Sequence, residues 1–306
     1  MRNASPQVEV CVPATTANLG PGFDILGLAL QLYNRFSLVV TSEPGWRVDL
    51  PPDVDLPSND NNLVLQAIRH LFSHVGFTCT GMHLTQVIDI PLARGLGSSS
   101  TAIVGGLIAA NYLSGADLNR ETLLAMAIEL EGHPDNVTPA LMGGLTLSYM
   151  ANGRHHYLSL SFPEELSAII AIPEFELSTA DARSVLPKQI SREDAIFNSS
   201  RTALLVYALQ QQRFDLLKTA MDDRLHQPYR AALVPGMADA IRAAYQAKAL
   251  GVALSGAGPS LLAFARDHTD AIATAMQHTF SQHGICCQTR ILSADTHGAT
   301  IVTPRP

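Results

Sequence analysis

Residues 91–101 read P-L-A-R-G-L-G-S-S-S-T and join an apolar segment typical of a strand to an apolar segment typical of a helix. Gly95 and Gly97 permit backbone conformations and close approaches that a side chain would prevent. The three serines that follow occupy a first helical turn, whose N–H groups lack intrahelical partners. These donors and the positive end of the helix dipole predict a phosphate site.

This turn differs from two familiar phosphate-binding motifs. It lacks the G-K-[ST] ending of a P-loop, and Ser100 stands where the dinucleotide motif G-x-G-x-x-G has its last glycine. Taken alone, the turn fits an ordinary Gly- and Ser-rich helix start equally well. The other motifs of the chain must decide between the two interpretations.

The composition is that of a chain able to form one large or two ordinary domains. Of its 306 residues, 47% are hydrophobic, which is enough for a full core. A net charge of -7 argues against nucleic-acid and anionic-membrane partners, since both need a basic patch. The four cysteines lack zinc-like spacing, and the start of the chain lacks a targeting pattern. We therefore expect a cytoplasmic protein without nucleic-acid or membrane partners.

The spacing of apolar residues predicts strands mixed with helices in two parts. In the first part we expect strands at 8–12, 25–41 and 83–90 and helices at 63–75, 98–113 and 120–131. In the second we expect strands at 157–161, 168–172, 252–254, 261–265 and 286–292 and helices at 192–212, 214–225, 237–249 and 269–283. Gly105 and Gly106, inside a predicted helix, indicate close packing on another element. The pattern is typical of an α+β fold with domains at 1–155 and 156–306.

Four motifs carry the polar residues suited to chemistry. They are P-A-T-T-A-N-L-G-P-G-F-D at 13–24, the turn at 91–101, E-G-H-P-D-N at 131–136 and S-G-A-G-P-S at 255–260. In this order they resemble the GHMP kinase superfamily of small-molecule kinases over nearly the whole chain. The first and third, with D-R-L-H-Q-P-Y-R at 223–230, resemble its homoserine kinase family. The resemblance implies an N-terminal domain similar to the second domain of ribosomal protein S5, a ferredoxin-like C-terminal domain, and a site in the cleft between them.

The resemblance also implies a reaction. ATP would phosphorylate the side-chain hydroxyl of L-homoserine to O-phospho-L-homoserine, in threonine biosynthesis, and the Gly-Ser turn would wrap the nucleotide phosphates. The residues implied for the nucleotide are Pro91, Leu92, Ala93, Arg94, Gly95, Leu96, Gly97, Ser98, Ser99, Ser100 and Thr101. Asn62 is a further candidate, for adenine, by its position. A homodimer is expected from the family alone.

A magnesium ion is implied at Ser99 and Glu131. A hard cation prefers oxygen ligands and usually keeps waters and substrate phosphate in its shell. Glu129 is a rival for Glu131, but two residues apart on a helix they point to nearly opposite sides, so only one can face the site. The alternative interpretation of Glu131 is a solvated acid at a helix end.

Homoserine is a zwitterion, so its site needs an acceptor for the ammonium and donors for the carboxylate. The resemblance assigns the ammonium to Asp24 and the carboxylate to Arg183 and Arg230, because a guanidinium binds a carboxylate with two hydrogen bonds. Gly256 would offer an N–H group from the second domain. The alternatives are surface salt bridges for the arginines and an ordinary hairpin turn for the glycine loop.

Asn136 stands where mevalonate kinase is thought to place an aspartate near the reacting hydroxyl. An amide cannot act as a general base at neutral pH. The implied mechanism is therefore direct in-line attack without a dedicated base, with catalysis by positioning and charge neutralisation. Asn18 and Asn136 would orient the hydroxyl, while Asp135 supports the loop and His133 is interpreted as a structural hydrogen-bonding residue.

Two alternatives of function stay open at this point. One is a GHMP kinase that acts on another alcohol, such as threonine or mevalonate; Asn136 and the paired arginines argue against mevalonate. The other is a sensor without activity, against which the intact glycine loops and the lack of a basic segment argue. Thr101 and Thr138 replace alanines usual in the family, which affects the fit of the nucleotide rather than the reaction class.

Overall fold

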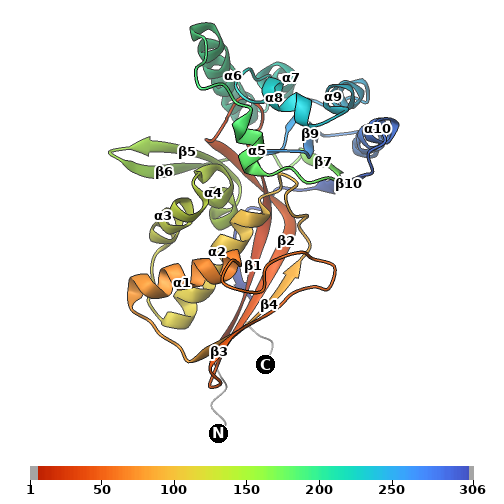
Figure 1. Cartoon of the computed structure of the whole chain (residues 1–306). Helices are drawn as coiled ribbons and strands as arrows, with labels where there is room; N and C mark the ends of the chain where they lie inside the picture. The colour runs from red at the N-terminus through yellow and green to blue at the C-terminus, as the bar shows by residue number, and fades with distance from the viewer. Residues whose placement is uncertain (1–5, 303–306) are drawn as a thin grey trace.

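The computed structural model describes residues 6–302, which form two sheets with helices packed on them (Figure 1). The first five residues, part of the chain start examined for a targeting pattern, lie outside this range. The first sheet has the order β11-β1-β2-β4-β3, and β5 joins it through β2 and carries β6. Its strands are β1 (Gln7–Ala17), β2 (Leu26–Thr41), β3 (Gly45–Asp49), β4 (Gly81–Ile88), β5 (Leu145–Ala151), β6 (Arg154–Leu160) and β11 (Thr300–Val302).

Four helices cover one face of the first sheet: α1 (Leu63–Val75), α2 (Ser98–Ser114), α3 (Arg120–Glu131) and α4 (Pro134–Met142). Alternate residues of the strands, such as Val10 and Phe36, are fully buried against them, as period-two alternation requires. A Cβ at Gly105 would lie 2.3 Å from Phe36 Cδ2, and one at Gly106 would lie 2.7 Å from the Val64 carbonyl oxygen of α1. The close packing predicted for these two glycines is confirmed.

The second sheet has the antiparallel order β10-β7-β9-β8. Its strands are β7 (Ser167–Pro173), β8 (Gly251–Leu254), β9 (Leu261–Ala265) and β10 (Cys287–Leu292). The helices α9 (Met237–Gln246) and α10 (Thr269–Gln282) pack on one face. This β-α-β-β-α-β arrangement confirms the ferredoxin-like prediction and the α+β class.

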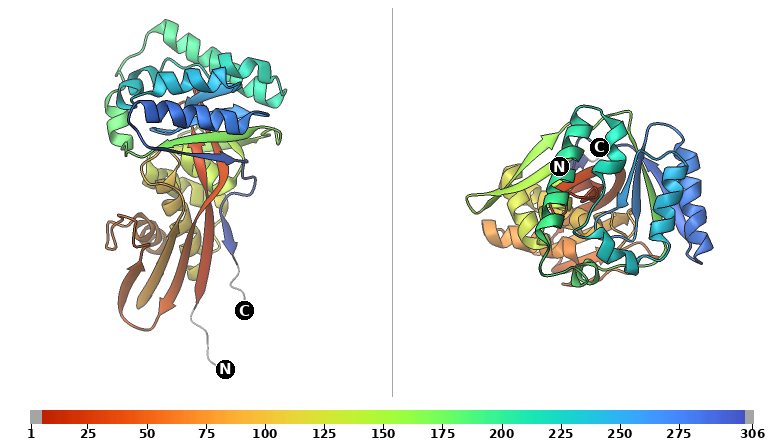
Figure 2. Two further views of the ribbon diagram at one scale, coloured as in Figure 1. Left: turned by 90° about the vertical axis from the view of Figure 1, so that its right-hand side faces the viewer. Right: turned by 90° about the horizontal axis from the view of Figure 1, so that it is seen from above.

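The other face of the second sheet contributes to a core shared with the first part. There α6 (Arg192–Gln210) and α7 (Leu217–Ala220) pack with Ile170 and Phe264 of the sheet and with Leu28 of β2. Figure 2 shows the second part seated on one end of the first sheet. Since the core is continuous across this junction, loops from both parts are held together there.

The predicted helix at 214–225 is wrong. The segment holds a short 3-10 turn, η1 (Phe214–Leu216), then α7, and the next helical turn is α8 (Gln227–Arg230), followed by η2 (Ala231–Leu233). The buried Asp223 carboxylate accepts hydrogen bonds from the backbone N–H groups of the three residues 225–227. A carboxylate that binds the backbone in this way offers an alternative to helical hydrogen bonds, which breaks the run.

The next two observations concern the predicted domain boundary and whether any helix is able to span a membrane. A division after residue 155 falls inside β6, and β6 and β11 both belong to the first sheet although they lie at or beyond it. The predicted boundary is therefore crossed twice by strand pairing, and it stays a prediction. Across residues 6–302, none of the helices has the length and apolar character needed to span a bilayer.

Candidate active site

The Gly-Ser turn connects β4 to α2 and contacts loops from both parts of the chain. The Thr15 N–H donates to the Leu96 carbonyl oxygen over 3.1 Å, and Ser255 Oγ donates to the Gly95 carbonyl oxygen over 2.7 Å. Gly95 has a φ of 75°, and a Cβ there would lie 2.2 Å from the Ser255 carbonyl oxygen. Because no L side chain fits this close approach, glycine is required where the two parts meet.

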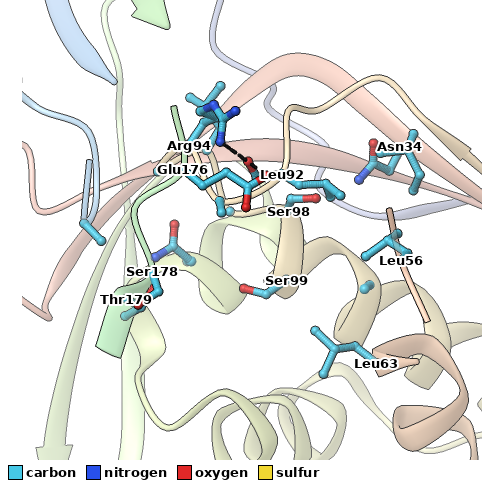
Figure 3. A pocket seen from close by; sticks show the side chains of 18 of the residues that line it. Asn34, Leu56, Leu63, Leu92, Arg94, Ser98, Ser99, Glu176, Ser178 and Thr179 are labelled. Atoms are coloured by element: carbon cyan, nitrogen blue, oxygen red, sulfur yellow. Dashed lines mark hydrogen bonds and ion pairs between the residues drawn. The ribbon is translucent and has the colours of Figure 1, made fainter. Parts of the chain in front are cut away.

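A cavity of about 420 Å³ opens beside the turn. Figure 3 shows Ser98 and Ser99 between an apolar side with Leu56 and Leu63 and a polar side with Arg94, Glu176, Ser178 and Thr179. In the described part of the chain, no side chain caps the N-terminus of α2, so its first N–H groups are left for a ligand. Such a terminus, next to an open cavity, suits a phosphate.

The predicted nucleotide residues divide by their contact with this cavity. Those that line it are Leu92, Ala93, Arg94, Gly95, Leu96, Gly97, Ser98 and Ser99. Pro91, Ser100 and Thr101 are absent from its wall. Thr101 is buried and its hydroxyl bonds to the Ser98 carbonyl and the Asn34 amide, so the extra hydroxyl of this chain serves the packing of α2.

Ser99 and Glu131 are brought together, as the metal prediction requires. Ser99 Oγ and Ser100 Oγ both donate to Glu131 Oε1 over 2.8 Å. Glu129 instead points away, with 71% of its side chain exposed and its carboxylate 3.7 Å from His70. The structure thus separates the two acids, and the oxygen atoms gathered around Glu131 are the kind that a magnesium ion binds.

Asn62 lies in the cavity wall but its side chain is committed elsewhere. Asn62 Oδ1 accepts from the Val64 N–H over 3.0 Å as the N-cap of α1, and Nδ2 donates to the Pro57 carbonyl oxygen over 2.9 Å. Gln86 of β4 also lines the cavity, and its buried Nε2 has no hydrogen-bond partner among residues 6–302. Sequence reasoning missed Gln86, because a single polar residue in a strand gives no signal.

The E-G-H-P-D-N segment turns from α3 into α4. Asp135 is buried, and its Oδ1 lies 2.6 Å from His133 Nδ1 and accepts from Asn136 Nδ2 over 3.3 Å. Burial opposes the charged form of His133, but the hydrogen bond and the charge of Asp135 outweigh it and raise the pKa of the imidazole. Thr15, which the sequence did not single out, donates to Asn136 Oδ1 over 2.8 Å. The Asn136 amide is therefore held in one orientation at the cavity wall.

Asn18 joins the first motif to the last. Its Nδ2 donates to the Gly256 carbonyl oxygen over 2.9 Å, and its Oδ1 accepts from the Asp24 N–H over 3.0 Å. Asn18 itself is buried and has a φ of 71°, a conformation that asparagine tolerates better than most residues. The side chain predicted to orient a hydroxyl thus also fixes the loop that carries Asp24.

The two predicted arginines lie over the Phe23 ring, and Arg183 pairs with Asp24. Arg183 donates to both carboxylate oxygens of Asp24, over 2.6 and 3.0 Å. The guanidinium carbons of Arg183 and Arg230 lie 5.4 and 5.3 Å from the Phe23 ring centroid, within the range of cation–π contact. Burial, and then the charge of Arg183, lowers the pKa of Arg230 to about 10, which still leaves it charged at neutral pH.

This cluster lies next to the cavity rather than in its wall. Asp24, Arg183 and Arg230 do not line the cavity, whereas Gly256, whose carbonyl oxygen accepts from Arg230 Nη1 over 3.1 Å, does. The ion pair between Asp24 and Arg183 therefore occupies the groups predicted to bind the two ends of a zwitterion. Sequence reasoning found these residues but not their pairing.

Comparisons with known proteins agree with this geometry. The family model described as GHMP kinases N terminal domain matches residues 62–144, and GHMP kinases C terminal matches 205–282. Homoserine kinase of Halothermothrix orenii is 46% identical, with 90% of this chain and 89% of that protein covered. Homoserine kinase of Persephonella marina is 45% identical, with 96% and 98% covered.

Solved structures give the same result. The crystal structure of homoserine kinase from Cytophaga hutchinsonii superposes with a TM-score of 0.89 at 31% identity, with 99% of each chain covered. A mevalonate kinase of L. major shares the fold, with a TM-score of 0.73 at 17% identity over 94% of this chain and 96% of that one. The two-domain fold expected from the motifs is confirmed. The chain belongs to the homoserine kinase family of the GHMP kinases.

Proposed function

We propose that this chain transfers the γ-phosphate of ATP to the side-chain hydroxyl of L-homoserine and releases O-phospho-L-homoserine and ADP, in threonine biosynthesis. The observation that carries the proposal is one carboxylate, Asp24, beside two guanidinium groups, Arg183 and Arg230, next to an open helix N-terminus. The first three groups are complementary to an amino-acid zwitterion, and the last to phosphate. The names of the relatives support the same substrate.

The nucleotide phosphates are assigned to the N–H groups at the start of α2, and the base to the apolar side of the cavity. Leu56 and Leu63 line that side, Gln86 supplies an unpartnered amide donor at the cavity wall, and Asn62 shapes the wall as a helix cap. Ser99 and Glu131 would hold magnesium through their oxygen atoms. When bound, the ion neutralises phosphate charge.

Homoserine would bind by replacing the ion pair between Asp24 and Arg183. Its ammonium binds Asp24 and its carboxylate binds Arg183 and Arg230, so contacts to the substrate replace the bidentate contact between Asp24 and Arg183. Asp24 and Arg183 each keep an opposite charge before and after the exchange, so neither is left unpaired in this half-buried site. The free pair also keeps Asp24 and Arg183 in place before the substrate arrives.

The chemical step needs positioning rather than a base. The homoserine oxygen forms a bond to the γ-phosphorus while the bond from that phosphorus to the β,γ-bridging oxygen breaks, and the hydroxyl proton leaves to phosphate or solvent. Asn136 lines the cavity with its amide held by Thr15 and Asp135, which suits a residue that orients a hydroxyl. Asp135 is buried behind it, a place suited to support of the loop.

The proposal is tested by ADP release from ATP and Mg²⁺ with homoserine, threonine, serine, mevalonate and galactose. We expect turnover selective for homoserine, with Arg183→Ala acting mainly on the homoserine KM. Another preferred alcohol would keep the kinase and overturn the substrate pocket. ATP binding without turnover of any alcohol would favour a sensor. From the family we also infer that the protein is a cytoplasmic homodimer. Size-exclusion chromatography tests whether it is a dimer.

A further inference from the structure

A buried chain of hydrogen bonds runs behind the substrate cluster. His226 Nε2 lies 2.8 Å from the Gly20 carbonyl oxygen, His226 Nδ1 lies 3.1 Å from Arg230 Nη1, and Nη1 also donates to the Gly256 carbonyl oxygen over 3.1 Å. Exposed fractions are 0% for His226 and 1% for Arg230. The chain connects the loop at 13–24 to the loop at 255–260 through α8.

The partners of His226 fix its protonation. Arg230 Nη1 can only donate, so His226 Nδ1 must accept, and a carbonyl oxygen can only accept, so Nε2 carries the hydrogen. The imidazole is therefore neutral and in a single tautomer. The Phe23 ring stacks on it at a centroid distance of 5.2 Å, which also holds its plane.

The surroundings of His226 agree with a neutral ring. Burial lowers the pKa of His226, and the charge of Arg230 lowers it further; the charges of Asp223 and Asp24 and the hydrogen bond to Gly20 act in the opposite direction. Asp223 Oδ2 is 3.5 Å from His226 Nε2, but this carboxylate already accepts three backbone N–H groups and the Asn198 amide. Protonation of the ring would place a hydrogen on Nδ1, which would then face the N–H group of Arg230 instead of accepting from it.

Two of the three guanidinium nitrogens of Arg230 are committed to the protein. Arg230 Nε donates to the Ala182 carbonyl oxygen over 3.0 Å, and Nη1 is held by His226 and Gly256. Among the residues that the structure describes, none accepts a hydrogen bond from Nη2. The bond to Ala182 also fixes the residue that precedes Arg183 on α5 (Thr179–Ser184).

On the basis of the proposed function, we propose that His226 is a positioning residue. It accepts a hydrogen bond from Arg230 Nη1 while it donates one to Gly20. It thereby fixes the guanidinium group with Nη2 free for the substrate carboxylate. The role concerns recognition of homoserine and not binding of ATP, because neither His226 nor Arg230 lines the cavity beside the Gly-Ser turn, and both are connected to that turn indirectly, through the residues at 13–24 and 255–260.

Two variants separate the two hydrogen bonds of the ring. An asparagine amide oxygen stands close to where imidazole Nδ1 lies, and a glutamine amide nitrogen close to where Nε2 lies. His226→Asn should therefore keep the acceptor for Arg230, while His226→Gln keeps the donor to Gly20. We expect His226→Gln to raise the homoserine KM about tenfold or more, since a hydrogen bond to a charged group is lost, and His226→Asn to stay closer to wild type. The ATP KM should change less than about twofold in both.

A shortened substrate distinguishes positioning from general damage. 3-Aminopropan-1-ol is homoserine without its carboxylate, so its kcat/KM should be the same in wild type and His226→Gln. His283→Asn is the matched control: this exposed histidine pairs with Asp239 on α9 and should leave both substrates unaffected. Equal losses with homoserine and 3-aminopropan-1-ol, or no loss with homoserine, would overturn the proposal.

A measurement on the unaltered protein covers the case in which the variants fail to fold. Nitrogen-15 NMR of the histidine rings should show one neutral imidazole with hydrogen on Nε2 and a bare Nδ1 that persists below pH 6.5, the usual pKa of histidine. A cationic ring, or hydrogen on Nδ1, at neutral pH for His226 would contradict the proposal. Wild type that turns over no homoserine would refute the proposed function instead, so the two failures are distinguishable.

Discussion

Arg183 and Asp24 form a bidentate ion pair, with nitrogen–oxygen distances of 2.6 and 3.0 Å, although they lie 159 residues apart in the chain. Each is about one-third exposed, so the pair is open to exchange with solvent or ligand. In the substrate-free protein it joins the loop after β1 to α5 across the two parts. Without substrate, each residue of the pair therefore supplies the opposite charge that the substrate would supply to the other. The two residues can be tested separately.

Removing the charge of Asp24 should discriminate between the two ends of homoserine. Asp24→Asn should lower kcat/KM for homoserine about 10- to 100-fold, because the substrate ammonium loses its anionic partner. 4-Hydroxybutanoate, which has the carboxylate but no ammonium, should not lose turnover and should gain, since Arg183 is released from its pair. Steady-state kinetics with both alcohols checks this. An equal loss with both would place Asp24 outside ammonium binding.

The two acids of α3 provide a matched pair for the metal site. Glu131→Gln should lower kcat about 100-fold or more and raise the magnesium concentration needed for half-maximal rate, because a charged oxygen ligand is lost. Glu129→Gln should stay within about twofold of wild type, since the Glu129 side chain is 71% exposed and faces His70. Magnesium titrations of the rate at saturating substrates measure both. If Glu129→Gln is the damaging change, the metal assignment is wrong.

Gly95 should tolerate no side chain. In Gly95→Ala the Cβ meets the Ser255 carbonyl oxygen at 2.2 Å, so the turn must shift away from the second part, and we expect the ATP KM to rise about tenfold or more. Gly115→Ala is the control: Gly115 has a φ of 65° but nothing within 4 Å of its Cβ position. It should cost about 1 kcal/mol of stability and leave the ATP KM unchanged. Similar KM changes in both variants would refute the contact argument.

Asp135→Asn should retain phosphorylation, with kcat within about tenfold of wild type. Asp135 is buried and its Oδ1 holds His133 and Asn136, a role that an amide oxygen can fill in part. Rapid-quench measurement of the chemical step is the test, with circular dichroism to confirm folding. A folded variant that has lost activity about 1000-fold or more would make Asp135 a general base.

The stability of the protein should fall on acidification in part through His226. Its pKa is lowered in the folded state, so below its unfolded value of about 6.5 the unfolded chain binds more protons than the folded one. Its contribution is therefore fully present above pH 6.5 and declines by up to about 1.4 kcal/mol per pH unit below it. The stability gap between wild type and His226→Asn in urea should narrow from pH 6.5 to 5.5. A constant gap would mean that His226 does not titrate as described.

Much of the fold could be predicted because its signals are local. The bounds of α1 and α3 coincide with the predicted helices, since Asn62 and Asn119 cap their starts and left-handed glycines end them. The meeting of Ser99 with Glu131 was expected from the family resemblance. The ferredoxin-like strand order followed from the family resemblance.

The remainder depends on contacts between distant segments. The run at 214–225 has helical periodicity, and only the backbone contacts of the buried Asp223 break it. His226 and Gly20 are 206 residues apart, and His226 in the sequence resembles any other histidine. The commitment of Asn62 to its cap rather than to adenine also appears only once α1 is placed.

Phosphorus NMR of the product formed from ATP, Mg²⁺ and L-homoserine tests the proposed reaction without intermediate assumptions. We expect a phosphomonoester resonance coupled to the γ-methylene protons of homoserine, formed in a one-to-one ratio with ADP and lost in Arg183→Ala at low homoserine. Release of inorganic phosphate alone, or binding of ATP with no phosphoester from homoserine, would contradict it.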